Sequence, residues 1–309
     1  MWKSAWIAGL VAAVLSPVAQ AAPDDYEQGI ATMWEVLWHQ SGTPTRLVRW
    51  EQDIRVRIHG VQLATHRAHT LQAIRDVAIE ANIKVIDVSD RPDAAQQANL
   101  SIEITADHVL EDNQPCVTYL NFQTENRIDS AAVQMRSRDA FRCAYHEAMH
   151  VMGVRGHPAG KTVLSYFPSK VDGLFTLDRV MLRAWYSPRM RGGMTPFEAL
   201  SIMGDELVAV MPDKQQASGS RDRFFKVIID QMHSFADGKG DVPVIVKRSG
   251  KATEEGIRFG RMEMSYFLGV AYQEGSTVPQ DPSLAMRWLQ RAATMGSRSA
   301  AARLSGASR

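Results

Sequence analysis

Two histidines and a glutamate, grouped in the segment His146-Glu147-Ala148-Met149-His150, have the types and spacing of a hydrolytic zinc site. On a helix, residues four apart share one face, so both imidazoles can turn toward a single ion. Glu147 lies beside them, where it can polarise a metal-bound water rather than bind the metal. Catalytic zinc keeps three protein ligands and one open position, so the motif requires a third ligand.

His157 is the expected third ligand. Gly153 falls where the motif helix must stop, and a residue free to adopt positive φ lets the chain reverse there. His157 then lies on the returning segment, within reach of the same ion at the usual distance of about 2.0–2.1 Å. The predicted zinc ligands are therefore His146, His150 and His157, with Glu147 as general base.

Hydrophobic periodicity indicates the elements that must position these residues. A strand is predicted at 54–58, where apolar and polar residues alternate, and further short strands follow at 83–88, 100–105, 117–122 and 128–135. Helices are predicted at 61–81 and at 138–154, the second carrying the zinc motif. We expect 128–135 to be an edge strand that could hold an extended peptide substrate. The pattern predicts an α+β domain.

The motif region resembles the metzincin metallopeptidases, whose pattern is His-Glu-x-x-His-x-x-Gly-x-x-His. The chain matches at His146, Glu147, His150 and Gly153, whereas the last histidine comes one residue later, at His157. An insertion at this point is known in some branches of the family. The resemblance covers roughly residues 54–186 and implies a metzincin-like mixed sheet with an active-site helix, Zn²⁺ as cofactor and hydrolysis of peptide bonds.

The segment Thr162-Val163-Leu164-Ser165-Tyr166 is similar to the turn beneath the metal in metzincins, where Ser-Val-Met-Ser-Tyr is a recurring form. Leu164 stands at the methionine position and could supply the same apolar floor. The resemblance implies that Tyr166 binds zinc or stabilises the oxyanion, so Tyr166 joins Glu147 as a candidate catalytic residue. A purely structural tyrosine is the alternative.

A second ligand set stays open. It keeps the two helix histidines and takes a glutamate from a later helix, as gluzincins do. Glu198 and Glu206 are the candidates, on a helix whose start is marked by Thr195 and Pro196. Ordinary surface glutamates are the alternative reading of both positions.

The first residues predict export. Lys3, the mostly apolar run 5–15 and the small residues Ala19-Gln20-Ala21 have the layout of a cleavable signal peptide, so we expect the mature chain to begin near Ala22. The apolar run is shorter than the roughly 20 residues of a membrane-spanning helix. The expected location is the periplasm or the outside of the cell, with an uncleaved anchor as the alternative and no membrane span in the mature chain.

Two cysteines, Cys116 and Cys143, remain in this exported chain. They predict a disulfide, which would stabilise the fold by roughly 3 kcal/mol in the chain-entropy model. The alternative is a thiolate ligand at Cys143, three residues before His146 on the same helix.

The C-terminal part has a different character. Residues 215–220 are polar and small and predict a linker. Residues 264–300 resemble a Sel-one-like repeat, a relative of the tetratricopeptide helix pair, in which Gly275 ends the first helix and the Val278-Pro279-Gln280-Asp281 loop caps the second. A lone repeat cannot bury its apolar face, so it should pack on the preceding helices or on a partner. The resemblance implies protein binding.

The predicted organisation is a signal peptide at 1–21, a metzincin-like domain at 22–190, a helical connecting region at 191–250 and an all-α repeat at 251–309. The net charge of +1 excludes bulk electrostatic attraction to nucleic acid. Two functions are predicted. The first is an exported zinc metallopeptidase that acts on peptides or proteins. The alternative is a non-catalytic exported adaptor that binds protein through its helical repeat.

Overall fold

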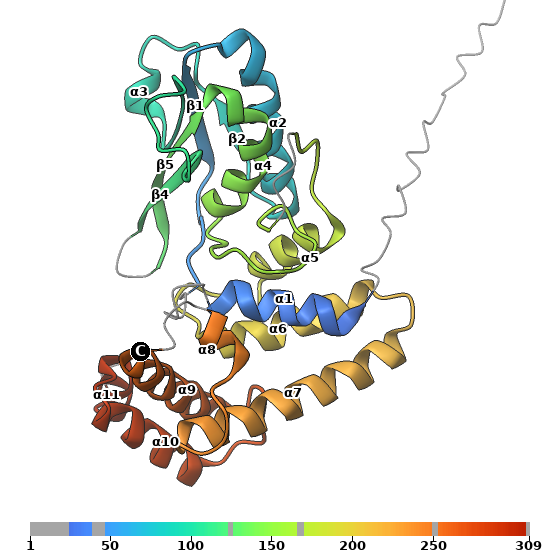
Figure 1. Ribbon diagram of the computed structural model, residues 1–309, viewed down its shortest axis with the longest axis vertical. Coiled ribbons are helices and arrows are strands. Elements are labelled where there is room, and N and C mark those ends of the chain that lie inside the picture. The colour runs from blue at the N-terminus through green and yellow to red at the C-terminus, as the bar shows by residue number, and fades with distance from the viewer. Residues whose placement is uncertain (1–24, 39–46, 123–125, 166–169, 249–252, 307–309) are drawn as a thin grey trace, which may run out of the picture.

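The computed structural model describes residues 25–38, 47–122, 126–165, 170–248 and 253–306, which form a sheet-based part and a helical part (Figure 1). The predicted signal peptide at 1–21 and the candidate Tyr166 lie outside the described residues. The fold class is α+β with a helical C-terminal region, as predicted. None of the described helices is both long and apolar enough to cross a bilayer.

A five-stranded mixed sheet has the strand order β2-β1-β3-β5-β4. Its strands are β1 (Ile54–Gly60), β2 (Val85–Asp87), β3 (Leu100–Thr105), β4 (Cys116–Phe122) and β5 (Ile128–Arg136). All neighbours are parallel except β4, which runs antiparallel to β5. The prediction that 128–135 forms an edge strand is wrong. β5 lies between β3 and β4, which agrees with its largely apolar sequence, and the more exposed β4 forms the edge.

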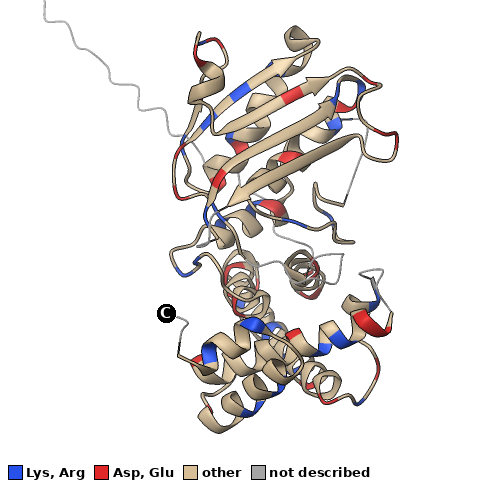
Figure 2. Cartoon of the chain, turned by 90° about the vertical axis from the view of Figure 1, so that its left-hand side faces the viewer, with Lys and Arg blue, Asp and Glu red and all other residues tan. Residues whose placement is uncertain are grey.

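Helices cover one face of the sheet. In β1, the side chains of Ile54, Val56 and Ile58 are buried against this layer, while the alternate side chains are partly exposed on the other face. The covering helices are α2 (Leu63–Glu80) and α4 (Ala140–Val151), which pack on each other (Figure 1). Figure 2 shows the sheet from its other side, in front of the helix layer. The short helix α3 (Ala94–Gln97) lies between β2 and β3 in the sequence. The 3-10 turn η1 (Ser137–Asp139) lies between β5 and α4. Because η1 leads directly from β5 into α4, the motif helix begins at one end of the sheet.

The helical part follows in sequence. Its helices are α5 (Thr176–Trp185), α6 (Pro196–Val210), α7 (Lys214–Ala236), α8 (Val244–Arg248), α9 (Glu254–Glu274), α10 (Pro282–Thr294) and α11 (Arg298–Leu304). The predicted linker at 215–220 is wrong, because these residues form the first turns of α7. Asp213 begins this helix, since its carboxylate accepts a hydrogen bond from the backbone N–H of Gln216 (2.8 Å).

The helix pair α9–α10 is covered by preceding helices, as predicted for a lone repeat. α9 packs on α7 and α6 as well as on α10. It ends at Gly275, and Asp281 caps α10 by accepting a hydrogen bond from the N–H of Leu284 (2.9 Å). Gly269 allows close packing, since a Cβ there would lie 2.7 Å from Leu289.

An N-terminal helix, α1 (Tyr26–Trp38), was not predicted. It packs on α6 and α7 in the helical part, although the chain that follows it enters the sheet (Figure 1). Its indole rings contact other helices: Trp34 lies 6.5 Å from Phe197 of α6 and Trp38 lies 6.2 Å from Phe267 of α9, between ring centroids. α1 therefore joins the first residues of the described chain to its C-terminal helices.

Candidate metal centre

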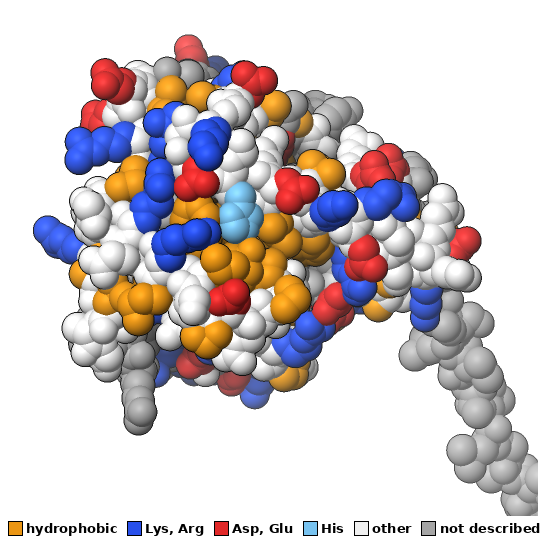
Figure 3. Space-filling view, turned by 90° about the horizontal axis from the view of Figure 1, so that it is seen from below, with side chains coloured by type: hydrophobic (Ala, Val, Ile, Leu, Met, Phe, Trp, Pro, Cys, Tyr) orange, Lys and Arg blue, Asp and Glu red, His pale blue; other side chains and the backbone are white. Residues whose placement is uncertain are grey.

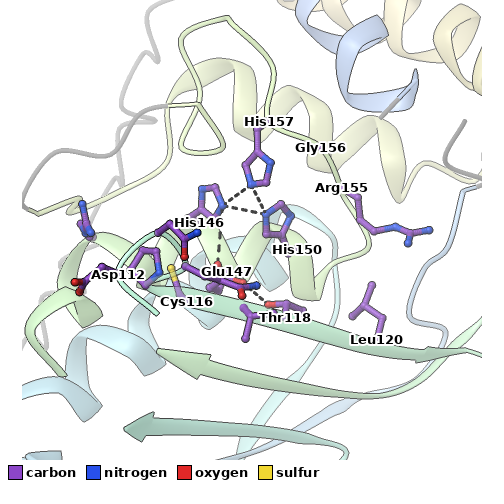
Figure 4. Close-up of a pocket in the computed structure, with 15 residues that line it drawn as sticks. Asp112, Cys116, Thr118, Leu120, His146, Glu147, His150, Arg155, Gly156 and His157 are labelled. Carbon is purple, nitrogen blue, oxygen red and sulfur yellow. Dashed lines mark hydrogen bonds and ion pairs between the residues drawn. The ribbon is translucent and has the colours of Figure 1, made fainter. Parts of the chain in front are cut away.

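Helix α4 and the segment after it bring three imidazoles together. The Nε2 atom of His146 lies 3.0 Å from that of His150 and 3.1 Å from that of His157, and the remaining pair is 3.4 Å apart. Figure 4 shows the three rings facing one another. Within the described residues, these histidines form the one cluster of metal-ligating side chains. The motif spacing and the one-residue delay before His157 are thus compatible with a single site.

Backbone carbonyls orient two of the rings. The Nδ1–H of His146 donates to the carbonyl of Val163, and the Nδ1–H of His150 donates to that of Val154, both at 2.9 Å. A proton on Nδ1 leaves Nε2 unprotonated, so its lone pair points into the cluster. Hydrogen bonds of this kind fix the tautomer and the direction of metal-ligating histidines.

The surroundings of the three histidines favour their neutral, unprotonated form. Burial, together with the neighbouring His150, lowers the pKa of His146 to about 2. Burial also lowers the pKa of His150 to about 4. Although the His157 side chain is accessible to solvent, the protein packed around its ring and the neighbouring His150 lower the pKa of His157 to about 4. Neutral imidazole is the form that binds metal. At neutral pH, protons therefore do not compete for these nitrogens.

The arrangement fits a tetrahedral zinc ion. Ligands about 2.0–2.1 Å from such an ion are separated from one another by about 3.3–3.4 Å. The observed separations of the Nε2 atoms, 3.0–3.4 Å, come close to this value. Three histidines on one side also leave a fourth position open toward the cleft, as catalytic zinc requires.

Glu147 lies beside the histidines and is almost completely buried. Its Oε2 accepts a hydrogen bond from the hydroxyl of Thr118 in β4 (2.6 Å), while Oε1 lies 4.0 Å from the Nε2 of His146. Burial raises the pKa of Glu147 to about 7, although the Thr118 hydrogen bond acts in the opposite direction. A carboxyl group with this pKa can both accept and donate a proton near neutral pH. Thr118 had not been predicted, because its role depends on how β4 pairs.

The disulfide between Cys116 and Cys143 is confirmed, and the alternative of a thiolate ligand at Cys143 is wrong. The bond joins the start of β4 to α4, so it ties the strand that carries Thr118 to the helix that carries Glu147. These elements border a cleft of about 570 Å³ that contains the three histidines. Its other walls come from the loop 112–115 and the segment 155–157.

The described part of the predicted turn, residues 162–165, lies next to His146. Asp178, fully buried at the start of α5, accepts hydrogen bonds from the Thr162 hydroxyl and from the N–H of Val163 (3.2 Å). The carbonyl of the same Val163 holds the His146 ring. Asp178 therefore positions the histidine through the turn. Leu164 is fully buried, in agreement with its predicted place in an apolar floor.

The segment that carries His157 rests on α1. The N–H of Ala159 donates to the carboxylate of Glu35 (2.8 Å). Gly160 approaches Thr32 so closely that a Cβ would lie 2.1 Å from the threonine hydroxyl. The third histidine is thus held by a helix more than a hundred residues earlier in the chain.

The alternative glutamate ligands lie elsewhere. Glu198 forms a capping box at the start of α6: its carboxylate accepts from the N–H of Thr195 (2.7 Å), and its own N–H donates to the Thr195 hydroxyl (3.2 Å). Neither Glu198 nor Glu206 belongs to the histidine cluster. The gluzincin-like ligand set is therefore not the one that the fold assembles.

Gly153 makes the turn that returns the chain to the cluster. Its φ is +88°, and a Cβ there would lie 2.2 Å from the carbonyl oxygen of Val48. We expect Gly153→Ala to reduce the free energy of unfolding by at least about 2 kcal/mol, through the left-handed backbone and the clash. Denaturant unfolding measures this. Gly173→Ala is the matched control, since a Cβ at Gly173 meets nothing within 4 Å. Equal unfolding midpoints for the two variants would contradict the prediction.

Two family models match the chain. Residues 24–160 match the model described as protein of unknown function (DUF2927), and residues 263–297 match the model of the Sel1 repeat. The helix pair α9–α10 is a Sel1 repeat. The predicted Sel-one-like repeat is therefore confirmed over residues 263–297, which we call the Sel1 region.

The DUF2927 match contains the whole histidine cluster but names no activity. The matches give no support to the predicted metzincin-like peptidase family for the N-terminal region. No curated protein and no solved structure matches the chain.

Proposed function

We propose that this protein is an exported zinc-dependent hydrolase that cleaves peptide bonds. The observation that supports this most strongly is the triangle of three histidine Nε2 atoms, 3.0–3.4 Å apart, in the lining of a cleft and beside a buried glutamate. His146, His150 and His157 would hold the zinc. A zinc ion bound there would supply Lewis acidity and would lower the pKa of a bound water to about 7.

Glu147 is the proposed general base. With Oε2 held by Thr118, its Oε1 is free to accept a proton from the attacking water and to pass it to the leaving amine. A pKa raised by burial suits both steps, because the group changes charge easily near neutral pH. Tyr166 remains the proposed stabiliser of the oxyanion, on the similarity of its turn to that of metzincins.

The proposed substrate is an extended peptide. β4 is an edge strand, and it lines the cleft through Val117, Thr118 and Leu120. An edge strand offers unpaired backbone groups to which an extended chain can add. A peptide lying along β4 would therefore pass in front of Glu147 and the histidines. The proposed location is the periplasm or the outside of the cell, which agrees with the disulfide.

Protein binding through the Sel1 region is the second candidate function. The family matches favour it more directly than hydrolysis, since the Sel1 repeat is related to helical repeats that bind proteins. The helical end of the molecule exposes hydrophobic side chains among basic ones (Figure 3). Met286 of α10 is 58% exposed, and the neighbouring Arg287 lies over the ring of Trp288. In this second function the protein is an adaptor that binds another protein through its Sel1 region, whether or not the histidine site is catalytic.

Metal analysis and a peptide-cleavage screen of the purified full chain separate the two functions. We expect about one zinc per chain and cleavage of some peptides that is lost on chelation and restored by zinc. A protein that binds no zinc and cleaves none of a broad set of peptides would refute the hydrolase and support the adaptor.

A further inference from the structure

Arg155 forms part of the cleft wall two residues before His157. Its guanidinium lies over the ring of Phe122, 5.9 Å from the ring centroid, at the end of β4. In Figure 4 it lies on the His150 side of the site, near Leu120, and at the opposite end from Asp112. Contact with an aromatic ring favours one region of space for a guanidinium, here the His150 end of the cleft.

This cation is not neutralised by the described part of the protein. Its Nε is buried and has no hydrogen-bond partner, and burial alone, with no described carboxylate acting against it, lowers the pKa of Arg155. The other cleft arginine, Arg142, is paired with Asp139 at 2.8 Å. The exposed Asp112 is paired with Arg136 and Arg138, at 2.8 and 2.6 Å. Partial burial without a counter-charge costs a guanidinium some of its hydration, and an anion bound in the cleft would offset that cost.

We propose that Arg155 determines substrate specificity by binding a carboxylate of the peptide, an inference that rests on the proposed peptidase function. The carboxylate is either an acidic side chain or the C-terminal carboxylate of a short peptide. The guanidinium offers planar, paired donors that match either one.

The position of Arg155 defines where this carboxylate lies. Along β4, Thr118 lies at the level of the reacting centre because its hydroxyl is bonded to Glu147. Phe122 lies at the level of Arg155, whose guanidinium contacts its ring. These residues are four positions apart, or about 13 Å at about 3.3 Å per residue. A peptide extended along β4 therefore brings a carboxylate to Arg155 when that group lies within about four residues of the scissile bond.

Equilibrium binding tests the inference independently of turnover. The probes are fluorescent hexa-alanine peptides, acetylated and amidated, with a single Glu or the isosteric Gln at each position in turn. A further peptide has a free C-terminal carboxylate. Dissociation constants are measured by anisotropy for the full chain, both zinc-loaded and metal-free, and for the variants Arg155→Gln, Arg155→Lys and Arg142→Gln.

We expect one Glu position, or the free C-terminus, to bind about tenfold or more tightly than its neutral counterpart. Arg155→Gln should abolish this preference, Arg155→Lys should retain part of it, and Arg142→Gln should leave it unchanged. The arm that shows the preference identifies the source of the carboxylate. A preference that persists in Arg155→Gln, or equal binding of acidic and neutral peptides by the unaltered chain, would overturn the inference.

Cleavage assays with the same peptides, set beside the binding measurements, separate this inference from the proposed function. Cleavage of neutral and acidic peptides with equal efficiency would refute the proposed role of Arg155 in specificity and would still support the proposed hydrolase function. Arg155-dependent carboxylate binding in a protein that cleaves nothing would keep the binding site and refute the hydrolase.

Discussion

Replacing Glu147 with glutamine is expected to leave zinc bound and to reduce kcat/KM for peptide hydrolysis by about three orders of magnitude or more. The amide cannot accept the proton of the attacking water. It has nearly the same shape and can still accept the Thr118 hydrogen bond, so the cleft should be preserved. Zinc content and kcat/KM are measured together. Glu206→Gln, outside the cluster, is the control and should be fully active. Undiminished hydrolysis by the Glu147 variant would remove the proposed mechanism.

The same variant should stabilise the metal-free protein at high pH. The pKa of Glu147 is about 7 in the folded chain, against 4.5 for the ordinary carboxyl. Folding therefore takes up a proton between these values, and the stability contributed by Glu147 falls as the pH rises through this window. Glutamine has no such dependence. At pH 8 we expect Glu147→Gln to raise the free energy of unfolding by about 3 kcal/mol at most, with the gain disappearing toward pH 4. A gain that does not depend on pH would contradict the burial of an ionisable group here.

Replacing His157 with alanine is expected to weaken zinc binding more than about 100-fold, since two imidazoles and solvent replace three imidazoles. His157 is exposed, so its removal should not unfold the chain, and circular dichroism checks this. Competition with a chromophoric chelator measures the affinity. Glu206→Ala provides the matched comparison and should bind zinc as the unaltered chain does. Zinc retained by His157→Ala and lost from Glu206→Ala would restore the gluzincin-like ligand set.

Local patterns predicted most of the elements around the site. The alternation at Ile54, Val56 and Ile58 gave a strand, and the spacing of His146 and His150 placed both on one helical face. Short-range spacing also predicted that the chain turns at Gly153 and returns with His157. These features depend on residues that are neighbours in sequence, so periodicity and backbone preference suffice to predict them.

Features that depend on strand order or on distant contacts were missed. Nothing in the apolar run 128–135 indicates which strand lies beside it, so β5 was mistaken for an edge strand and Thr118 was overlooked. Asp178 holds a turn that lies 15 residues away, and its role appears only when α5 packs behind His146. α1 did carry a signal: Ile30, Met33, Trp34 and Leu37 have helical spacing and are all buried.

The position of α1 limits where this chain can be cut into fragments that keep their cores covered. Trp34 and Trp38 are 5% and 1% exposed because α6 and α9 cover them, and the same helix supports the segment of His157. A chain cut after residue 190 would leave both indoles uncovered beneath the histidine cluster. The sheet-based part and the helical part therefore share α1, and a fragment that contains only the sheet-based part would need a substitute cover for the indoles of α1.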